Sequence, residues 1–242
     1  MFETLPPERL TRALDDAAGE LLEEARCRGG AVDAVRVARR LGLTVARDRT
    51  LNGRARFARL SVARGRVRGA IFVGEAERPE RLQWAVAHEL GEIAVHRVFE
   101  DLHIPAADEP PGLREQLANE LARRILLPLR PFERAGRDCH WDFYELKRVF
   151  PTASHELLAR RMLDLATPAI ITVCDHGRIS WRRKSEPGPV PAPSPQERLC
   201  LRVAHETGEY QQQASAGLSI RAWPVHEPDW KREILRTEPL EE

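Results

Sequence analysis

One segment of the chain combines residue types that can bind a metal ion and activate water. His88, Glu89 and Glu92 form the pattern His-Glu-x-x-Glu within residues 79–99, where apolar residues recur at helical spacing. On a helix, positions i and i+4 lie about 40° apart, so His88 and Glu92 can reach one ion. The glutamate between them can take a proton from water. This pattern indicates metal-assisted hydrolysis, although Glu92 stands where the helical zinc motif has its second histidine.

The same spacing occurs again at His205–Glu209, so the pattern alone is weak. In the first copy, apolar residues flank the ionisable stripe on both sides, and buried ionisable groups are costly unless they are paired or coordinated. The alternative is a solvent-facing stripe with ordinary hydrogen bonds. In the second copy, Thr207-Gly208 and the polar run 211–213 make a poor helix. The context therefore favours the first copy.

A third ligand can come from residues 113–127, which also show helical spacing and end before a proline. Glu115 lies on the same side of this helix as small and apolar residues, which suits a helix packed closely against a metal-bearing neighbour. The alternative is a rim carboxylate paired with Arg114 or Arg123. Glu115 is thus the candidate acidic ligand.

The remaining elements place these two helices in an α+β chain. Helices are predicted over 10–28, 32–41, 79–99, 113–127, 143–150 and 154–165. Strands are predicted at 43–46 and 218–223, and hairpins over 53–75 and 168–182. Helices 143–150 and 154–165, separated by a proline turn, resemble a helix-turn-helix pair, and a small β-containing segment ends the chain.

Four regions follow from this organisation. Residues 1–130 carry the candidate site, and residues 131–184 hold the helix-turn-helix-like pair and a hairpin. The sequence SEPGPVPAPSP at 185–195 is typical of a linker. The role of residues 196–242 is left open.

Composition excludes some classes of function. The net charge is +1, from 38 basic and 37 acidic residues, which argues against a general nucleic-acid-binding polycation. No apolar run approaches the roughly 20 residues of a membrane span. Four cysteines without a Cys-x-x-Cys pair favour reduced thiols. We therefore expect a cytoplasmic protein without a membrane partner, and the overall charge does not favour DNA binding, although local basic patches are compatible with it.

The predicted hairpin is rich in arginine, and Arg54 and Arg56 are candidate substrate-binding residues. An exposed strand can align a peptide, and its arginines would favour an acidic target or DNA. The alternative is solubilising charge on an edge strand.

Taken together, the two candidate helices resemble the ImmA/IrrE metallopeptidase family. That family combines an HExxH helix with a second helix of pattern E-x-x-A-N-x-x-A-x-x-L-L-x-P. Here the first helix opens at RPER and contains AVAHELGEIAVH, and the second reads EQLANELA and ends at ILLP. The resemblance covers roughly residues 10–175. It implies a zincin-like helical domain with a small β-sheet, His88 as first metal ligand, Glu89 as general base and Glu115 as acidic ligand.

The resemblance also implies a metal-dependent endopeptidase of narrow specificity that cleaves a partner helix-turn-helix repressor. The second ligand would fall on Glu92, and two interpretations remain. Glu92 can bind the ion, giving a harder and more negative donor set that reduces the preference for Zn²⁺ over Mn²⁺. Alternatively, the metal is lost, and an inactive family member acts as a regulatory module that binds protein or DNA.

Overall fold

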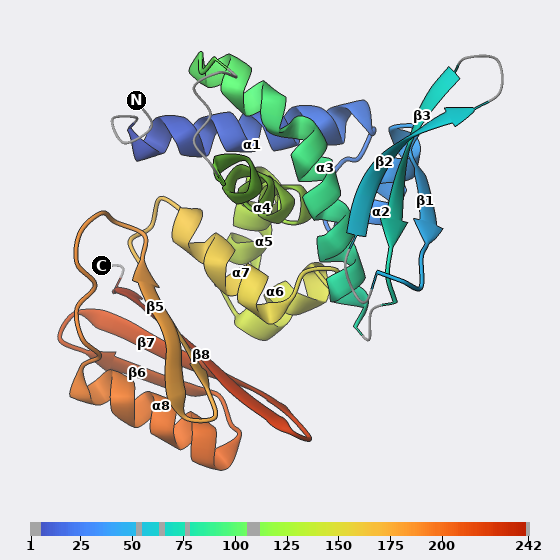
Figure 1. Cartoon of the computed structure of the whole chain (residues 1–242). Helices are drawn as coiled ribbons and strands as arrows, with labels where there is room; N and C mark the ends of the chain where they lie inside the picture. Colours follow the sequence, from blue (N-terminus) through green and yellow to red (C-terminus); the bar gives the residue numbers. More distant parts are fainter. Residues whose placement is uncertain (1–5, 52–54, 63–65, 76–77, 106–111, 241–242) are drawn as a thin grey trace. The chain divides into compact units, whose positions relative to one another are not determined.

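The chain forms two compact units, Met1–Ser154 and His155–Glu242. A computed structural model describes residues 6–51, 55–62, 66–75, 78–105 and 112–240. Both units contain helices and strands, which confirms the predicted α+β class (Figure 1). The regional boundaries predicted at residues 130, 184 and 195 stay predictions.

Three helices form the core of the first unit. Its helices are α1 (Pro7–Glu24), α2 (Ala34–Arg40), α3 (Pro79–Leu102), α4 (Leu113–Leu126), α5 (Leu129–Asp138) and α6 (Phe143–Val149). The long helices α1, α3 and α4 pack against one another, and Leu14, Leu90 and Leu121 are fully buried between them. Proline at the first position of α3 suits a helix start, because its missing amide has no helical partner there.

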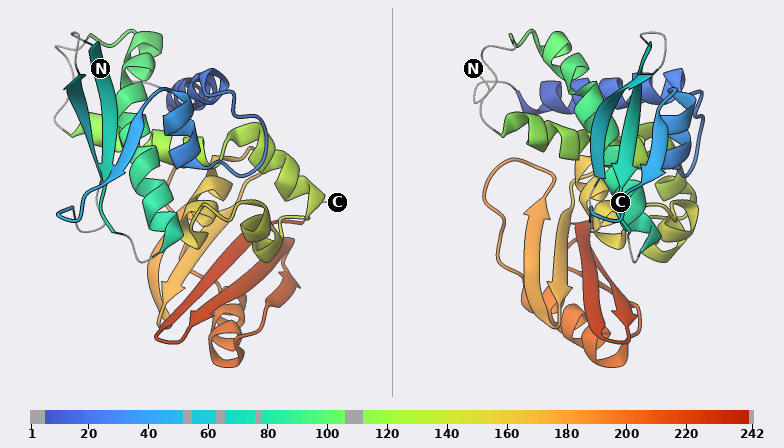
Figure 2. Two further views of the ribbon diagram at one scale, coloured as in Figure 1. Left: turned by 90° about the vertical axis from the view of Figure 1, so that its right-hand side faces the viewer. Right: turned by 45° about the vertical axis from the view of Figure 1, so that its right-hand side comes forward.

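A three-stranded sheet lies beside these helices. Its strands are β1 (Thr44–Arg47), β2 (Ala55–Val62) and β3 (Arg66–Val73), in the order β1-β3-β2. β2 and β3 are antiparallel, as the hairpin prediction requires, and β1 pairs with β3 in parallel. The turn at 63–65 lies outside the described residues. Figure 2 shows α2 and α3 alongside the sheet, with β2 at its edge.

α3 and α4 approach closely at Gly91. A Cβ atom on Gly91 would lie only 2.5 Å from the carbonyl oxygen of Ala118, which belongs to helical backbone and cannot move aside easily. The glycine therefore sets the helix spacing that brings Glu115 of α4 close to His88 of α3.

We expect Gly91→Ala to destabilise the first unit by about 1–3 kcal/mol, because the added methyl group must push α4 away. Gly19→Ala is the matched control, since a Cβ at Gly19 in α1 meets no atom within 4 Å. Alanine there should stabilise the helix by about 0.5–1 kcal/mol. Urea denaturation followed by circular dichroism measures both changes. Equal stability of the two variants would contradict this account of helix spacing.

The second unit is a helix on a five-stranded antiparallel sheet. It begins with α7 (His155–Arg161) and a 3-10 turn (Met162–Asp164). The remaining elements are β4 (Ile170–Asp175), β5 (Arg178–Lys184), α8 (Pro195–Thr207), β6 (Gln211–Ser215), β7 (Leu218–Glu227) and β8 (Trp230–Pro239). The strand order is β5-β4-β8-β7-β6, and α8 covers one face (Figure 1).

The sequence pattern does not indicate α8, β6 or β8. The start of α8 has a local signal, because Ser194 and Glu197 form a capping box and Pro195 occupies the first helical position. The strands β7 and β8 alternate polar and apolar residues only in part, since the sheet is buried on the α8 face and the alternation is interrupted at Pro224. Among the helices that the structure describes, none combines the length and apolar character of a membrane span.

Candidate metal centre

The three candidate metal ligands converge. His88 and Glu92 project from successive turns of α3, and Glu115 projects from the first turn of α4. One ligand atom from each lies within 4.8 Å of the other two, and His88 Nε2 is 3.5 Å from Glu115 Oε2. The side chain of Glu115 is 63% exposed, whereas that of His88 is 19% exposed. The cluster is therefore more exposed to solvent at Glu115 than at His88.

Asn119 orients two of these side chains. His88 Nδ1 donates to Asn119 Oδ1 at 3.2 Å, and Asn119 Nδ2 donates to Glu115 Oε1 at 3.2 Å. The amide oxygen cannot donate, so the His88 proton resides on Nδ1 in this contact and Nε2 keeps its lone pair for an ion. Such outer contacts fix the tautomer and the ring orientation of a metal-binding histidine.

Loss of the Asn119 amide should weaken metal binding. We expect Asn119→Ala to lower metal affinity by about 10–100-fold, the usual effect of removing an outer-shell partner. Gln116→Ala is the matched control, because Gln116 is exposed on the same helix and is not part of the cluster. Competition with a chromophoric chelator measures both affinities. If Asn119→Ala binds as tightly as the control, Asn119 does not position His88.

Glu92 has a second partner. Arg114 Nε donates to Glu92 Oε2 at 3.0 Å, and Arg114 also donates to the Glu92 carbonyl oxygen at 3.2 Å. The sequence suggested Arg114 or Arg123 as alternative partners of Glu115, but the structure places Arg114 on Glu92 and Arg123 on Glu120. A metal ion that binds the Glu92 carboxylate must therefore compete with the Arg114 guanidinium or share the carboxylate with it.

Glu89 is the most buried acid of the cluster, with 9% of the residue exposed. Its Oε2 accepts a hydrogen bond from the backbone amide of Phe57 in β2 at 2.6 Å. Burial raises the pKa of the Glu89 carboxyl above its ordinary value, and the Phe57 amide opposes this effect. The carboxylate is thus held at the edge strand, beside the three candidate ligands.

The candidate residues outside the ligand cluster are the two hairpin arginines and His96. Arg56 is exposed on β2, with its guanidinium 6.0 Å from the centre of the Phe72 ring, and Arg54 lies outside the described residues. His96 is exposed, and its Nδ1 contacts the backbone oxygen of Ile93 at 2.8 Å. It does not join the cluster, as its distance along α3 predicts.

The basic residues of the helix-turn-helix-like segment are engaged within the protein. Lys147 donates to Glu80 at 2.7 Å, and Arg160 pairs with Glu156 and lies over the Trp181 ring. Arg161 is fully buried and donates to Asp164. Each of these three cations pairs with a carboxylate of the same chain.

A family model described as IrrE N-terminal-like domain, peptidase family M78, matches residues 38–162, which is just over half of the chain. The matched segment contains the complete cluster, from Phe57 and Glu89 to Asn119. The chain belongs to this family. Peptidase family M78 is metal-dependent, and the matched segment contains a group of three residues, His88, Glu92 and Glu115, that could hold a metal ion.

A solved structure described as a Mycobacterium tuberculosis transcriptional regulator is similar to this M78-family chain. The TM-score is 0.67 at 20% identity, over 93% of this chain and 75% of that one. This likeness shows a shared fold. No curated protein matches the chain.

The sequence pattern assigns no role to two residues of the centre, Asn119 and Phe57. Asn119 belongs to the quoted family motif, so the signal was present, but its contacts with both His88 and Glu115 depend on how the two helices cross. The bond from the Phe57 amide to Glu89 has no sequence signal, because any residue on the edge strand supplies the same amide.

Proposed function

We propose that the chain is a metal-dependent endopeptidase of narrow specificity. The observation that carries this proposal is the convergence of His88, Glu92 and Glu115 beside Glu89. One imidazole and two carboxylates suit Zn²⁺, with Mn²⁺ as a second ion that a harder donor set accepts. A divalent ion held there would polarise the scissile carbonyl and make water more acidic.

The protein's own residues supply the proton transfer and the alignment. Glu89 takes a proton from the attacking water and passes it to the leaving amine. The Phe57 amide holds this carboxylate in place, and Asn119 keeps His88 and Glu115 oriented. The edge strand β2 can pair with an extended peptide, which would lie across the cluster. Exposed Arg56, together with Arg54, would favour an acidic segment in that peptide.

The substrate that fits this proposal is a partner helix-turn-helix repressor. Family M78 is associated with the cleavage or binding of transcriptional regulators. Such a repressor acts in the cytoplasm, where the free thiols of Cys27, Cys139, Cys174 and Cys200 would stay reduced. Neither DNA nor a membrane is required for recognition.

The test requires a candidate helix-turn-helix repressor, chosen from the genes that neighbour this one wherever the genome encodes such a protein there. The purified chain is incubated with this protein and with Zn²⁺ or Mn²⁺, and new amino termini are identified by mass spectrometry. We expect a single cleavage site that disappears when a chelator is added. The proposal fails if the two proteins form a complex and no metal condition produces a new terminus.

That failure would favour a second candidate function, an inactive module that binds the regulator without cutting it. The ion pair between Glu92 and Arg114 supports this alternative, because it can satisfy the Glu92 carboxylate without an ion. In that case, removal of metal leaves complex formation unchanged.

A further inference from the structure

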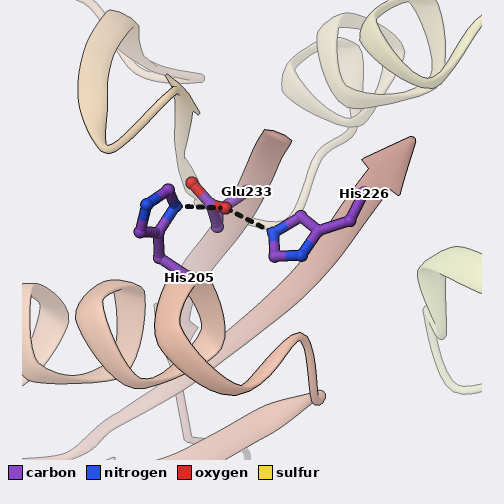
Figure 3. Close-up of side chains that lie close together, drawn as sticks. All are labelled: His205, His226 and Glu233. Atoms are coloured by element: carbon purple, nitrogen blue, oxygen red, sulfur yellow. Dashed lines mark hydrogen bonds and ion pairs between the residues drawn. The ribbon is translucent and has the colours of Figure 1, made fainter. Parts of the chain in front are cut away.

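A second cluster of metal-binding residue types lies in the second unit. Figure 3 shows His205, His226 and Glu233 directed toward one another from α8, β7 and β8. His205 Nδ1 is 2.9 Å and His226 Nε2 is 2.7 Å from the same oxygen, Glu233 Oε1. The three ligand atoms all lie within 4.8 Å of one another.

The carboxylate in this cluster is deeply buried, with 1% of the Glu233 side chain exposed. A buried carboxylate needs a compensating positive charge. Glu197, in the first turn of α8, is also buried, and both of its carboxylate oxygens accept hydrogen bonds from Arg182 at 3.0 Å. Within the described residues, the ion-pair partners of Glu233 are the two imidazoles alone. Between α8 and the sheet, one buried glutamate is therefore neutralised by a guanidinium, and the other is surrounded by metal-binding side chains.

The surroundings favour a cation. His205 lies in the last turn of α8, where the helix dipole presents its negative end. The glycines at the two neighbouring turns, Gly177 and Gly208, have φ values of +73° and +70°. A Cβ on Gly177 would lie 3.6 Å from His205 Nε2, and one on Gly208 would lie 3.4 Å from His226 Nδ1. Both turns thus close around the imidazoles, while the histidine side chains remain 32% and 21% exposed.

We propose that His205, His226 and Glu233 form a second metal site that binds Zn²⁺. Two imidazole nitrogens and one carboxylate oxygen are a known three-ligand zinc set, with water as the fourth ligand. Ligand atoms around a tetrahedral zinc ion lie about 3.3 Å apart, given bond lengths of about 2.0–2.1 Å. The two contacts to Glu233 Oε1 need to lengthen by only about 0.5 Å to admit the ion, and the partly exposed imidazoles can move outward.

The site would connect three elements. Zn²⁺ would hold the end of α8 on β7 and β8, at the opposite end of α8 from the contact between Glu197 and Arg182. The expected role is structural, because the bound ion stabilises the folded unit by mass action. This site is independent of the peptidase centre, which lies in the first unit.

The test separates the two sites by using full-length variants. His88→Ala removes the imidazole of the first centre, and His88→Ala combined with His226→Gln removes one from each. Zinc binding is measured by chelator competition, and Co²⁺ spectra report tetrahedral coordination. We expect His88→Ala to bind one equivalent of Zn²⁺ at the second site. Addition of Zn²⁺ should raise the Tm of this variant by about 5 °C or more above that of its metal-free form. The combined variant should lose this equivalent and this shift.

His205→Gln in the His88→Ala background provides a second test, and circular dichroism reports whether each variant folds. The proposal is overturned if folded His88→Ala binds less than about a tenth of an equivalent, or if His226→Gln and His205→Gln leave its zinc binding unchanged. The proposal is also overturned if the combined variants have a lower Tm than His88→Ala while Zn²⁺ leaves the Tm of His88→Ala unchanged. The two histidines would then stabilise the unit through their hydrogen bonds to Glu233 and not through zinc. The single variant His226→Gln keeps the first centre intact, so its zinc binding measures that centre alone. Absence of zinc at the second site can therefore be distinguished from absence of metal at the proposed peptidase centre.

Discussion

Glu89→Gln is expected to reduce peptidase activity by about 10²–10⁴-fold while leaving metal affinity nearly unchanged. The glutamine amide keeps the shape of the side chain but cannot take a proton from water. It can still accept the hydrogen bond from the Phe57 amide, so β2 should stay in place. Because Glu89 is a proton acceptor and not a candidate ligand, activity and metal binding should separate in this variant.

The measurement is kcat/KM on a peptide that spans the cleavage site found in the repressor, with bound metal determined on the same samples. Glu100→Gln is the matched control, since Glu100 is an exposed acid on the same helix and lies outside the cluster. The control should retain full activity. Activity in Glu89→Gln equal to that of the control would exclude Glu89 as the general base.

Glu92→His is expected to raise zinc affinity by about tenfold or more, which corresponds to about 1.4 kcal/mol or more. Two physical effects contribute. Imidazole nitrogen is a softer donor that suits Zn²⁺ better than a carboxylate oxygen, and with His88 and Glu115 it gives the two-histidine, one-glutamate set of catalytic zinc sites. The substitution also removes the competition from Arg114, although that pair is partly exposed and its contribution is reduced by solvent.

The affinities for Zn²⁺ and Mn²⁺ are compared by chelator competition in the His226→Gln background, which removes the second site. Arg81→His places an exposed imidazole on α3 with no histidine three or four residues away, and it controls for nonspecific zinc binding. The ratio of Zn²⁺ to Mn²⁺ affinity should rise only in Glu92→His. An unchanged ratio would mean that residue 92 does not contact the ion.

Much of the first unit could be predicted from local signals. The helix around His88 and Glu92 follows from its apolar spacing and its starting proline, and the placement of Glu115 follows from the second motif. Helix ends were less accurate: α1 ends at Glu24, before the glycine pair at 29–30 that suggested its end, because Arg26 already adopts a left-handed conformation.

Contacts that join distant segments could not be predicted in this way. The pairing of Arg114 with Glu92 depends on the crossing of α3 and α4, which Gly91 permits. His205, His226 and Glu233 lie on three elements of the second unit, and their separations along the chain follow no ligand spacing. The His205–Glu209 pattern does not lie on one helix face, since α8 ends at Thr207 and Gly208 caps it, but the sequence pattern does not indicate that His205 meets His226 and Glu233.

Anomalous scattering from crystals grown with Zn²⁺ tests the central claim most directly, because it locates each ion. The account predicts a zinc peak at about 2.0–2.2 Å from His88 Nε2 and from carboxylate oxygens of Glu92 and Glu115. A zinc-loaded crystal whose map has no peak among these three side chains would contradict it, whatever is found at Glu233.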